Sequence, residues 1–429
     1  MKPKKILLVT SFFPYGNGES FIKAELEHIA DCFDGIEIVP CFHSPAMARK
    51  QITQDVDLDY SSTRWGFFRG YHVVASLINA LRRYRWRADA LRILQSSERM
   101  VNLKELARAL YRAQLFEKFL EKKILKDGDE VSLIYFYWMI PEIVGAAAFR
   151  RHSRLPIKVV CRAHGGDLYE DRRAGGYAGL RDSIVTGVDK IYCISDHGKS
   201  YLTAKYPLLA KKIQTARLGV VDPGFLNVAP RGGALAIVSC SFLVYEKRVH
   251  LIVDAIACLL ENDPALTIRW THIGNGPLFD KVRAYAARKL PDPGRVEVNF
   301  TGYLPQAQVM NLYRETGFDV FVNVSDAEGL PVSLMEASSA GMPMVATNVG
   351  GSNEIVNAAN GVLLDADPSV DDIAAALLIF HHRAVAGVYR QRARSYWAKN
   401  YHAQVNYNKF GHDLACLVDH PANAGCFLK

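Results

Sequence analysis

The chain has 429 residues, which is long for a single hydrophobic core, so two domains are the natural expectation. Its composition, with 49% hydrophobic and 22% charged residues, is that of a globular protein and excludes a largely disordered chain. No apolar run approaches the ~20 residues that a membrane-spanning helix needs. The net charge of +8 permits an anionic partner without identifying one.

The eight cysteines include no Cys-x-x-Cys pair. Cys41, Cys161, Cys193 and Cys240 stand inside apolar runs typical of strands, where a reduced, buried thiol is the expected state. We therefore expect a cytoplasmic protein without a structural zinc site.

The first half of the chain alternates short apolar runs with helical patterns. Pro14, Gly16 and Gly18 interrupt the first run, and no small-residue cleavage site follows it, so a buried strand is expected there rather than a signal peptide. Most runs are continuously apolar, as parallel strands covered on both faces require. A helix is predicted over GESFIKAELEHIADCF, and the predicted strands are KILLVTSF, IEIVPCF, VSLIYFYW, IKVVCRAHG, DKIYCISD and KIQTARLG.

The second half repeats this order after a polar, Pro- and Gly-rich join at residues 222–234. The alternation predicts an α/β protein with two doubly wound, Rossmann-like domains that face a cleft. We place the domains at residues 1–222 and 223–400, with a helix over 401–429 that packs back on the first domain. Predicted helices include RVHLIVDAIACLL and PLFDKVRAYAARKL, and the predicted strands are LAIVSCSF, LTIRWTHIG, RVEVNFTG, DVFVNV, PMVAT and GVLLD.

The stretch SDAEGLPVSLMEASSAGMPMVATNVGG, residues 325–351, lies where an apolar strand gives way to a helix, the edge at which open α/β sheets bind ligands. Pro331 suits the first helical position, and Gly329 lets the backbone approach a ligand. The free N–H groups and the dipole of that helix start favour a phosphate. Glu328 and Glu336 could each accept hydrogen bonds from two sugar or ribose hydroxyls, which suggests a nucleotide-sugar. The alternative is a solvated loop acid and a helix-surface acid.

This stretch resembles the signature of the retaining GT-B glycosyltransferases of glycosyltransferase family 4, through the Glu-x7-Glu pattern EGLPVSLME followed by AGMPMVATNVGGSNEIV. Similar pieces occur in family order and together span about residues 6–410. The piece SFFPYGNGES is also similar to the start of enzymes that build bacterial surface polysaccharides. These pieces are SFFPYGNGES, RAHGGDLY, ISDHGKSYL, RLGV, SFLVYEKRVHLIVDA, IGNGPL, FTGYLP and NGVLLD.

The resemblance implies a role for each matched residue. Glu336 would bind the ribose and Glu328 the donor sugar. The N–H groups of Gly329, Leu330 and Val332 would flank the sugar or the diphosphate. The pieces IGNGPL and FTGYLP add three further donor-binding residues, Gly274, Gly276 and Tyr303.

The diphosphate clamp of such enzymes is an arginine followed five residues later by a lysine. In SFLVYEKR, Lys247 keeps the lysine, but Phe242 stands where the arginine is expected. Phenylalanine does not replace a planar, bidentate donor, so the adjacent Arg248 is the candidate that would compensate. The alternatives are a surface lysine before a helix and an arginine that points to solvent.

His164, in CRAHGGDLY, matches the strand-end histidine that contacts the donor sugar in such enzymes, although a lone histidine is more often a core or surface residue. Asp167 could orient the substrate or cap the following helix. The N-terminal turn would place Gly16 and Gly18 beside the donor phosphate and the acceptor. Glu19 could equally open an ordinary helix there.

A basic, aromatic helical segment lies within about residues 62–126 and includes RWGFFRGYHVVASLINALRRYRWRADALRIL. Such a composition suits the surface of an anionic membrane. The alternative is an insertion whose apolar face packs on the N-terminal domain. Nucleic-acid binding is not expected, because no recognised module accompanies the charge.

We therefore expect a retaining glycosyltransferase of the hexosyltransferase type that moves sugar from a UDP- or GDP-sugar donor to a saccharide or lipid-linked oligosaccharide acceptor. The pathway implied is bacterial surface polysaccharide synthesis, at a cytoplasmic location with peripheral contact to the inner membrane leaflet. His164, Glu328 and Lys247 form the expected catalytic set. Neither a metal nor a cofactor is expected, because basic groups replace a cation. A non-catalytic nucleotide-sugar-binding protein, favoured by Phe242, and a nucleotide-sugar epimerase remain alternatives.

Overall fold

The computed structural model describes residues 5–16, 19, 21–42, 57–58 and 70–419. Its internal contacts divide the chain into two compact units. The N-terminal unit comprises Met1–Ala216 and Asn406–Lys429, and the C-terminal unit comprises Arg217–Val405. The domain boundaries that we expected after residues 222 and 400 remain predictions, and this contact division falls within a few residues of them.

The N-terminal unit contains a seven-stranded sheet in the order β3-β2-β1-β4-β5-β6-β7, with every pairing parallel. All six strands predicted in the first half of the sequence are confirmed. The short edge strand β3 was not predicted, because two residues show no periodicity. The strands are β1 Lys5–Thr10, β2 Gly35–Pro40, β3 Asp57–Leu58, β4 Leu133–Phe136, β5 Lys158–Ala163, β6 Lys190–Cys193 and β7 Ile213–Thr215.

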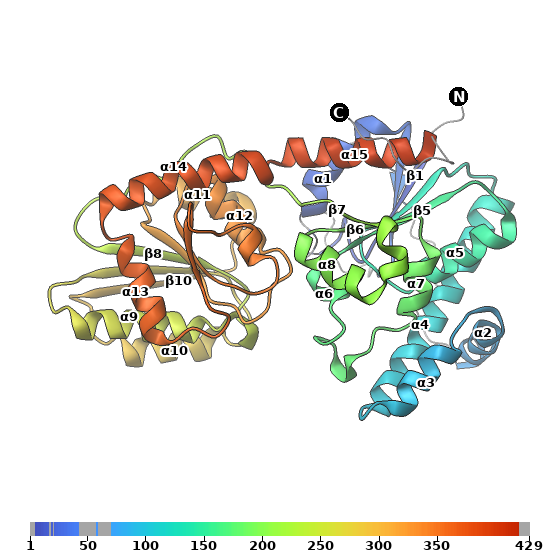
Figure 1. Cartoon of the computed structure of the whole chain (residues 1–429), viewed down its shortest axis with the longest axis horizontal. Coiled ribbons are helices and arrows are strands. Elements are labelled where there is room, and N and C mark those ends of the chain that lie inside the picture. Colours follow the sequence, from blue (N-terminus) through green and yellow to red (C-terminus); the bar gives the residue numbers. More distant parts are fainter. Residues whose placement is uncertain (1–4, 17–18, 20, 43–56, 59–69, 420–429) are drawn as a thin grey trace. The chain divides into compact units, whose positions relative to one another are not determined.

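Alternate side chains of β1 show how the two faces of this sheet are covered. Leu7 and Val9 join a core with helices that lie on one face, whereas Ile6 and Leu8 join a core with α1 and α15 on the other. Buried strands of this kind read as continuous apolar runs, which is why the sequence revealed them. The helices (Figure 1) are α1 Phe21–Ile29, α5 Glu142–Ser153, α6 Gly165–Leu168, α7 Arg181–Gly187, α8 Asp196–Lys205 and α15 Ala403–Asp419.

Between β3 and β4 the described chain forms α2 Gly70–Arg83, α3 Arg87–Gln95, α4 Arg99–Leu120 and the π-helix Glu121–Lys126. This is the helical insertion that the sequence predicted. One face of α4 packs against α5 so closely that a Cβ added at Gly145 would lie 2.1 Å from the carbonyl oxygen of Ala113. Part of the insertion therefore packs on the core of the N-terminal unit, as the alternative interpretation required.

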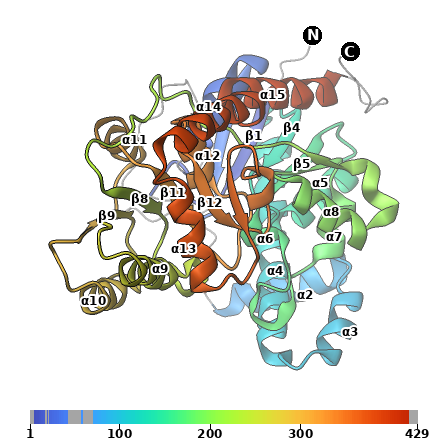
Figure 2. The ribbon, with the colours of Figure 1, turned by 60° about the vertical axis from the view of Figure 1, so that its left-hand side comes forward.

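The C-terminal unit contains a six-stranded sheet in the order β10-β9-β8-β11-β12-β13, again parallel throughout. Figure 2 shows α9 and α13 on one side of it and α12 on the other. All six strands predicted in this half are confirmed. They are β8 Leu235–Cys240, β9 Ile268–Ile273, β10 Val296–Gly302, β11 Val320–Asn323, β12 Met344–Thr347 and β13 Gly361–Leu364.

Helices of the C-terminal unit are α9 Val249–Asn262, α10 Phe279–Lys289, α11 Gln306–Glu315, α12 Val332–Ser339, α13 Val370–Ile379 and α14 Arg383–Asn400. The chain then returns to the N-terminal unit through α15, whose residues from Asn406 onward belong to that unit. The guanidinium of Arg162, on β5, lies 4.0 Å from the ring centroid of Phe410 on α15 and 2.9 Å from a carboxylate oxygen of Glu25 on α1. None of the described helices is both long and apolar enough to cross a membrane.

Candidate functional site

A pocket of about 420 Å³ opens at the carboxyl edge of the C-terminal sheet. It is walled by the chain that follows β8, by the turn after β9 and by the start of α12. Gly276, Gly329, Arg248 and Glu336 are not among its lining residues. The pocket brings together eight residues that the sequence analysis discussed for the donor site, Phe242, Lys247, Gly274, Tyr303, Glu328, Leu330, Pro331 and Val332.

Lys247 and Glu328 form an ion pair inside this pocket. The ammonium nitrogen lies 2.6 Å from Glu328 Oε1. The same oxygen is 3.1 Å from Nδ2 of Asn323, which donates to it, and 2.7 Å from the hydroxyl of Ser325. Glu328 is buried, so its interpretation as a solvated loop acid is wrong. Asn323 and Ser325 were not singled out from the sequence.

The backbone fixes the loop that carries Glu328. Gly350 has φ +54°, and a Cβ there would lie 2.0 Å from the carbonyl oxygen of Glu328, so only glycine fits. The N–H of Gly351 donates to the oxygen of Gly329 at 2.8 Å. The N–H of Asp326 donates to the oxygen of Glu246 at 2.9 Å, which joins this loop to the one that carries Lys247.

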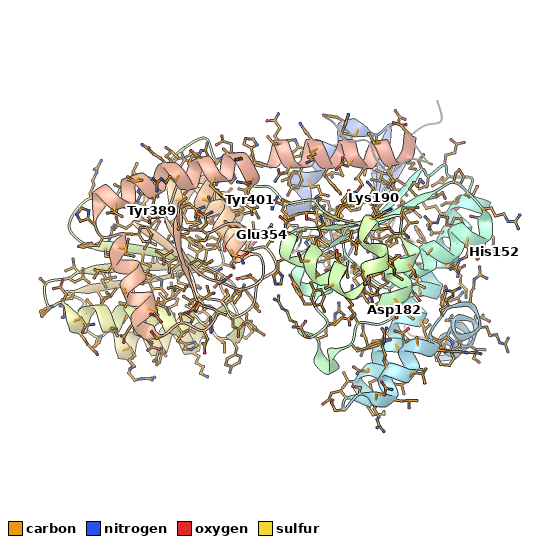
Figure 3. All side chains as sticks on the ribbon, viewed as in Figure 1. His152, Asp182, Lys190, Glu354, Tyr389 and Tyr401 are labelled. Atoms are coloured by element: carbon orange, nitrogen blue, oxygen red, sulfur yellow. The ribbon has the colours of Figure 1, made fainter. Side chains whose placement is uncertain are left out.

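The segment after these glycines is anchored in turn by aromatic hydroxyls. Tyr401 and Tyr396 both donate to the carbonyl oxygen of Glu354, at 2.6 and 2.9 Å. Figure 3 labels Glu354 and Tyr401. These two hydrogen bonds fix the segment around Glu354 to the end of α14.

Glu336 lies on α12 and is buried, so its interpretation as a helix-surface acid is wrong. Burial raises the pKa of this carboxyl to about 7, and a 3.0 Å hydrogen bond from the side chain of Gln306 opposes the rise. Burial and then the charge of Glu336 raise the pKa of Cys240, which lines the pocket, to about 12. Glu336 therefore lies close behind the pocket wall, half ionised near neutral pH.

The start of α12 offers backbone donors to the pocket. The helix begins at Val332, one residue later than we expected, so Pro331 is its N-cap residue and not its first helical residue. Among the described residues, no acceptor lies within hydrogen-bonding distance of the N–H groups of Gly329, Leu330 and Val332. Such donors, with the dipole of the helix behind them, favour an anion.

Gly274 and Gly276, which we predicted to bind the donor, lie where two backbone segments pack closely beside the pocket. A Cβ at Gly274 would lie 1.9 Å from the carbonyl oxygen of Ser241, and one at Gly276 would lie 2.5 Å from that of Leu243. The turn after β9 can therefore approach the end of β8 only with glycine at both positions. Tyr303 is exposed at the pocket rim.

Arg248 points into the protein rather than to solvent. Its Nε donates to the oxygen of Val324 at 2.8 Å, and Nη2 donates to the oxygens of Ser325 and Ala366 at 3.1 and 2.8 Å. Nη1 pairs with the exposed Asp367 at 3.1 Å. These contacts tie the end of β11 to the loop after β13, and they favour a structural role for Arg248.

His164 lies in the N-terminal unit at the end of β5 and is the N-cap residue of α6. Its ring packs 4.8 Å from that of Tyr137 and 4.5 Å from that of Trp138. Burial, and then the charge of Arg162, lower the pKa of His164 to about 3, so the ring is neutral. Its buried Nε2 has no hydrogen-bond partner among the described residues. Each nitrogen of a neutral imidazole either donates or accepts one hydrogen bond, so Nε2 has the capacity for one more partner.

Asp167 and Glu19 organise the backbone around His164. Asp167 accepts from the N–H groups of His164 and Met139 at 2.6 and 2.7 Å, so it caps the helix, and burial raises the pKa of its carboxyl to about 6. Glu19 has a role that we did not predict. Its carboxylate accepts hydrogen bonds from the indole N–H of Trp138 and from three consecutive backbone N–H groups, those of Ser11, Phe12 and Phe13.

Gly16, in the loop after β1, has φ +65° and no other atom where a Cβ would lie. Gly18 falls outside the described residues. The proposed contact of this turn with a donor phosphate therefore stays a prediction.

A second cavity, of about 360 Å³, lies at the carboxyl edge of the N-terminal sheet, between the end of β2 and the start of α5. Arg112 of α4 crosses it and binds Glu142 through two hydrogen bonds of 2.7 and 2.9 Å. The same guanidinium lies 4.8 Å from the ring centroid of Phe42. We did not predict this cavity, because its parts are far apart in the sequence.

No three His, Cys, Asp or Glu side chains within the described ranges gather as a metal site requires. Residues 228–398 match the protein-family model described as glycosyl transferases group 1. This segment is therefore similar to the members of that family. It holds the whole pocket built around Lys247 and Glu328.

Curated proteins to which this chain is similar include bacterial proteins named as glycosyltransferases. The chain is 27% identical over 277 residues to a putative colanic acid biosynthesis glycosyltransferase, WcaL, of Salmonella typhimurium, covering 62% of this chain and 66% of the relative. It is 39% identical over 248 residues to the O-antigen biosynthesis glycosyltransferase WbnH of Escherichia coli, covering 57% and 66%. The match to the Escherichia coli WcaL covers 54% of that protein. The chain thus aligns with about half to two thirds of the length of these relatives.

Solved structures share the fold over nearly the whole chain. The lipopolysaccharide outer core galactosyltransferase WaaB superposes with a TM-score of 0.66 at 17% identity, covering 97% of this chain and 99% of that one. HepE of Anabaena, solved with UDP and glucose, gives 0.63 at 16% identity, covering 96% and 99%. Together with the two parallel sheets, this likeness assigns the GT-B fold, with two Rossmann-like domains, as predicted.

Proposed function

We propose that the chain is a retaining glycosyltransferase that moves a sugar from a nucleoside diphosphate donor to an acceptor in bacterial surface polysaccharide synthesis. The match to the group 1 family model and relatives named for colanic acid and O-antigen synthesis support this assignment. The observation that carries it is the pocket in which the Lys247–Glu328 pair faces backbone N–H groups with no described acceptor. These groups are the complement of a sugar diphosphate.

The donor would bind with its diphosphate between Lys247 and the start of α12 and its ribose on Glu336. An ionised Glu336 can accept from two ribose hydroxyls, and burial strengthens both hydrogen bonds. A UDP-sugar is the favoured donor, because the structurally similar HepE has been solved with UDP. A GDP-sugar stays the alternative.

In the reaction, the bond between the anomeric carbon and the diphosphate oxygen breaks, and the acceptor hydroxyl oxygen forms the new bond on the same face. The acceptor proton passes to an oxygen of the departing phosphate. Negative charge grows on that phosphate, where Lys247 and the α12 N–H groups would stabilise it. Each preorganised donor of this kind contributes ~2.7–4 kcal/mol to transition-state stabilisation. We propose that these groups replace a metal ion.

For the acceptor we propose the cavity of the N-terminal unit beside Phe42. An aromatic ring with a bidentate Arg112–Glu142 pair offers one apolar face and several hydrogen-bonding edges. A saccharide has the same mixture of apolar and hydroxyl faces. The neutral His164 lies at the same sheet edge, and its contact with the donor sugar stays a proposal that rests on the resemblance.

The test is a screen of UDP and GDP sugars by thermal shift, followed by measurement of nucleotide release with and without saccharide acceptors. Bound nucleotide raises the melting temperature by mass action. We expect stabilisation by UDP and acceptor-dependent UDP release. Sugar epimers formed without acceptor would instead indicate an epimerase, and binding without turnover on any acceptor would indicate a non-catalytic protein.

A further inference from the structure

A third cavity, of about 340 Å³, lies in the N-terminal unit and belongs to neither site described above. Its walls are the end of α2, one side of α5 and the last turn of α7. Four arginines from two distant parts of the sequence line it, Arg83, Arg85, Arg150 and Arg151, and no carboxylate is among its lining residues.

Two of these arginines already have acidic partners. Arg83 donates to Glu117 at 2.8 Å, and Arg150 binds Asp189 and the oxygen of Gly187, the latter at 3.0 Å. Arg85 and Arg151 are exposed, and no carboxylate of the described residues pairs with either of them.

The nearest acid on α7 does not neutralise the cavity. Asp182, labelled in Figure 3, precedes the lining residue Ser183. Its carboxylate is engaged by Arg92 at 2.6 Å and by the hydroxyl of Tyr206 at 2.7 Å. The cavity therefore keeps two uncompensated guanidinium groups, which are planar donors suited to a phosphate.

The cavity lies at the amino edge of the N-terminal sheet. Asp189, the partner of Arg150, immediately precedes β6 and accepts from the N–H of Val159 near the start of β5 at 2.8 Å. His164 and the cavity beside Phe42 lie at the opposite, carboxyl edge. The arginine cavity is thus separate from the proposed catalytic edge.

The insertion whose helix α2 ends at this cavity also exposes large apolar side chains. On α3, Leu91 and Leu94 are each 62% exposed, and they share one side of the helix with Arg87. Soluble proteins rarely gather such side chains over so short a stretch unless the surface contacts something. The exposed set runs through all three helices of the insertion and comprises Ile78, Leu81, Leu91, Leu94, Met100, Val101 and Leu103.

We propose that this surface docks on an anionic membrane, with the arginine cavity holding a lipid phosphate and the exposed leucines entering the interface. Charge complementarity selects an anionic partner, and the apolar side chains select a lipid rather than a free phosphate, which would leave them in water. The proposal concerns where the enzyme works and not which sugar it transfers.

The test is co-sedimentation of the full chain with phosphatidylcholine vesicles, with and without phosphatidylglycerol. The wild-type protein should bind only the vesicles with phosphatidylglycerol, and less as salt rises. Arg85→Gln with Arg151→Gln should weaken binding by about tenfold, since each cation near the surface adds attraction. Leu91→Ser with Leu94→Ser should also weaken it.

The matched control is Arg283→Gln with Arg288→Gln on α10, two exposed arginines of the C-terminal unit, which should bind like the wild type. The docking proposal is overturned if wild-type protein ignores both vesicles, if the control loses as much as the cavity variant, or if the leucine variant binds unchanged. All variants should keep the thermal shift given by UDP. A loss of that shift in the wild type would instead contradict the proposed function.

Discussion

The ammonium nitrogen of Lys247 lies 2.6 Å from Oε1 of Glu328, although 81 residues separate them in the sequence. A backbone hydrogen bond between Asp326 and Glu246 brings their two loops together. The carboxylate thus holds the cation in place at the pocket wall. A bound diphosphate would compete with Glu328 for the same ammonium, so the two residues should differ in what their removal does.

Glu328→Ala should lower kcat by about 100-fold, because Lys247 loses the partner that positions it for the leaving phosphate. The dissociation constant for UDP should change by less than about threefold, since the freed lysine can still bind a phosphate. Steady-state kinetics would measure the change in kcat, and calorimetry would measure the dissociation constant for UDP. Asp326→Ala, which removes an exposed carboxylate two residues earlier, is the control and should behave like wild type. Equal losses in kcat and affinity would contradict the separate roles.

Lys247→Ala and Arg248→Ala should separate function from stability. Loss of Lys247 should reduce kcat/KM by about 100-fold or more with little change in melting temperature. Loss of Arg248 removes three hydrogen bonds from a charged donor to backbone oxygens, so the free energy of unfolding should fall by about 2–3 kcal/mol. The folded fraction should keep near-normal UDP affinity. An Arg248→Ala protein of normal stability that fails to bind UDP would reverse this ranking.

The sequence could predict every described strand except the two-residue β3, because buried parallel strands are continuous apolar runs that can be recognised without their neighbours. It could also place Glu328 and Lys247 at strand-end loops. It could not predict that one oxygen of Glu328 meets Asn323, Ser325 and Lys247 at once, since such contacts depend on loop conformation.

Arg248 shows why adjacency in sequence is a weak guide to a site. Arg248 follows Lys247 directly, yet it does not line the pocket that Lys247 lines. Only the folded structure shows that its guanidinium donates to three backbone carbonyl oxygens. The arginine cavity could not be predicted for a related reason, because Arg83 and Arg151 line one cavity only in the folded chain.

Donor binding should depend on the ionisation of Glu336. The folded protein raises the pKa of this carboxyl from 4.5 to about 7, while the ribose hydroxyls need the ionised form as acceptor. UDP affinity should therefore fall by about tenfold between about pH 8 and about pH 6, as the carboxylate takes up a proton. Calorimetry in two buffers should detect the proton released on binding. Unchanged affinity across this range would exclude Glu336 as the ribose acceptor.

The raised pKa of Glu336 also predicts that the free energy of unfolding falls as pH rises, whereas UDP affinity increases. A raised pKa means that the protonated form stabilises the fold at low pH, and that this contribution is lost as pH rises through about 7. Glu336→Gln stays neutral and keeps its bond to Gln306, so it should melt higher than wild type at about pH 8. It should also bind UDP weakly with no pH dependence. A variant that is merely misfolded would melt lower.

Activity should survive an excess of EDTA, because the positive charge opposite the diphosphate comes from Lys247 and the α12 N–H groups. UDP release would be measured after chelation and again after adding back Mg²⁺ or Mn²⁺, and the rates should agree within about twofold. Loss of activity that either ion restores would contradict the metal-independent mechanism.

Phe242→Arg tests whether the missing arginine weakens the donor site. Phe242 lines the pocket and is 59% exposed, so a longer side chain can enter without displacing the core. A guanidinium there would form charge-assisted hydrogen bonds to the diphosphate, worth about 1.5–3 kcal/mol, or about tenfold or more in UDP affinity. The gain should shrink as salt rises. Phe242→Gln, which is polar but shorter and uncharged, is the control and should give little gain. If arginine brings no improvement, the diphosphate does not lie beside residue 242, and the placement of the donor between Lys247 and α12 must be revised.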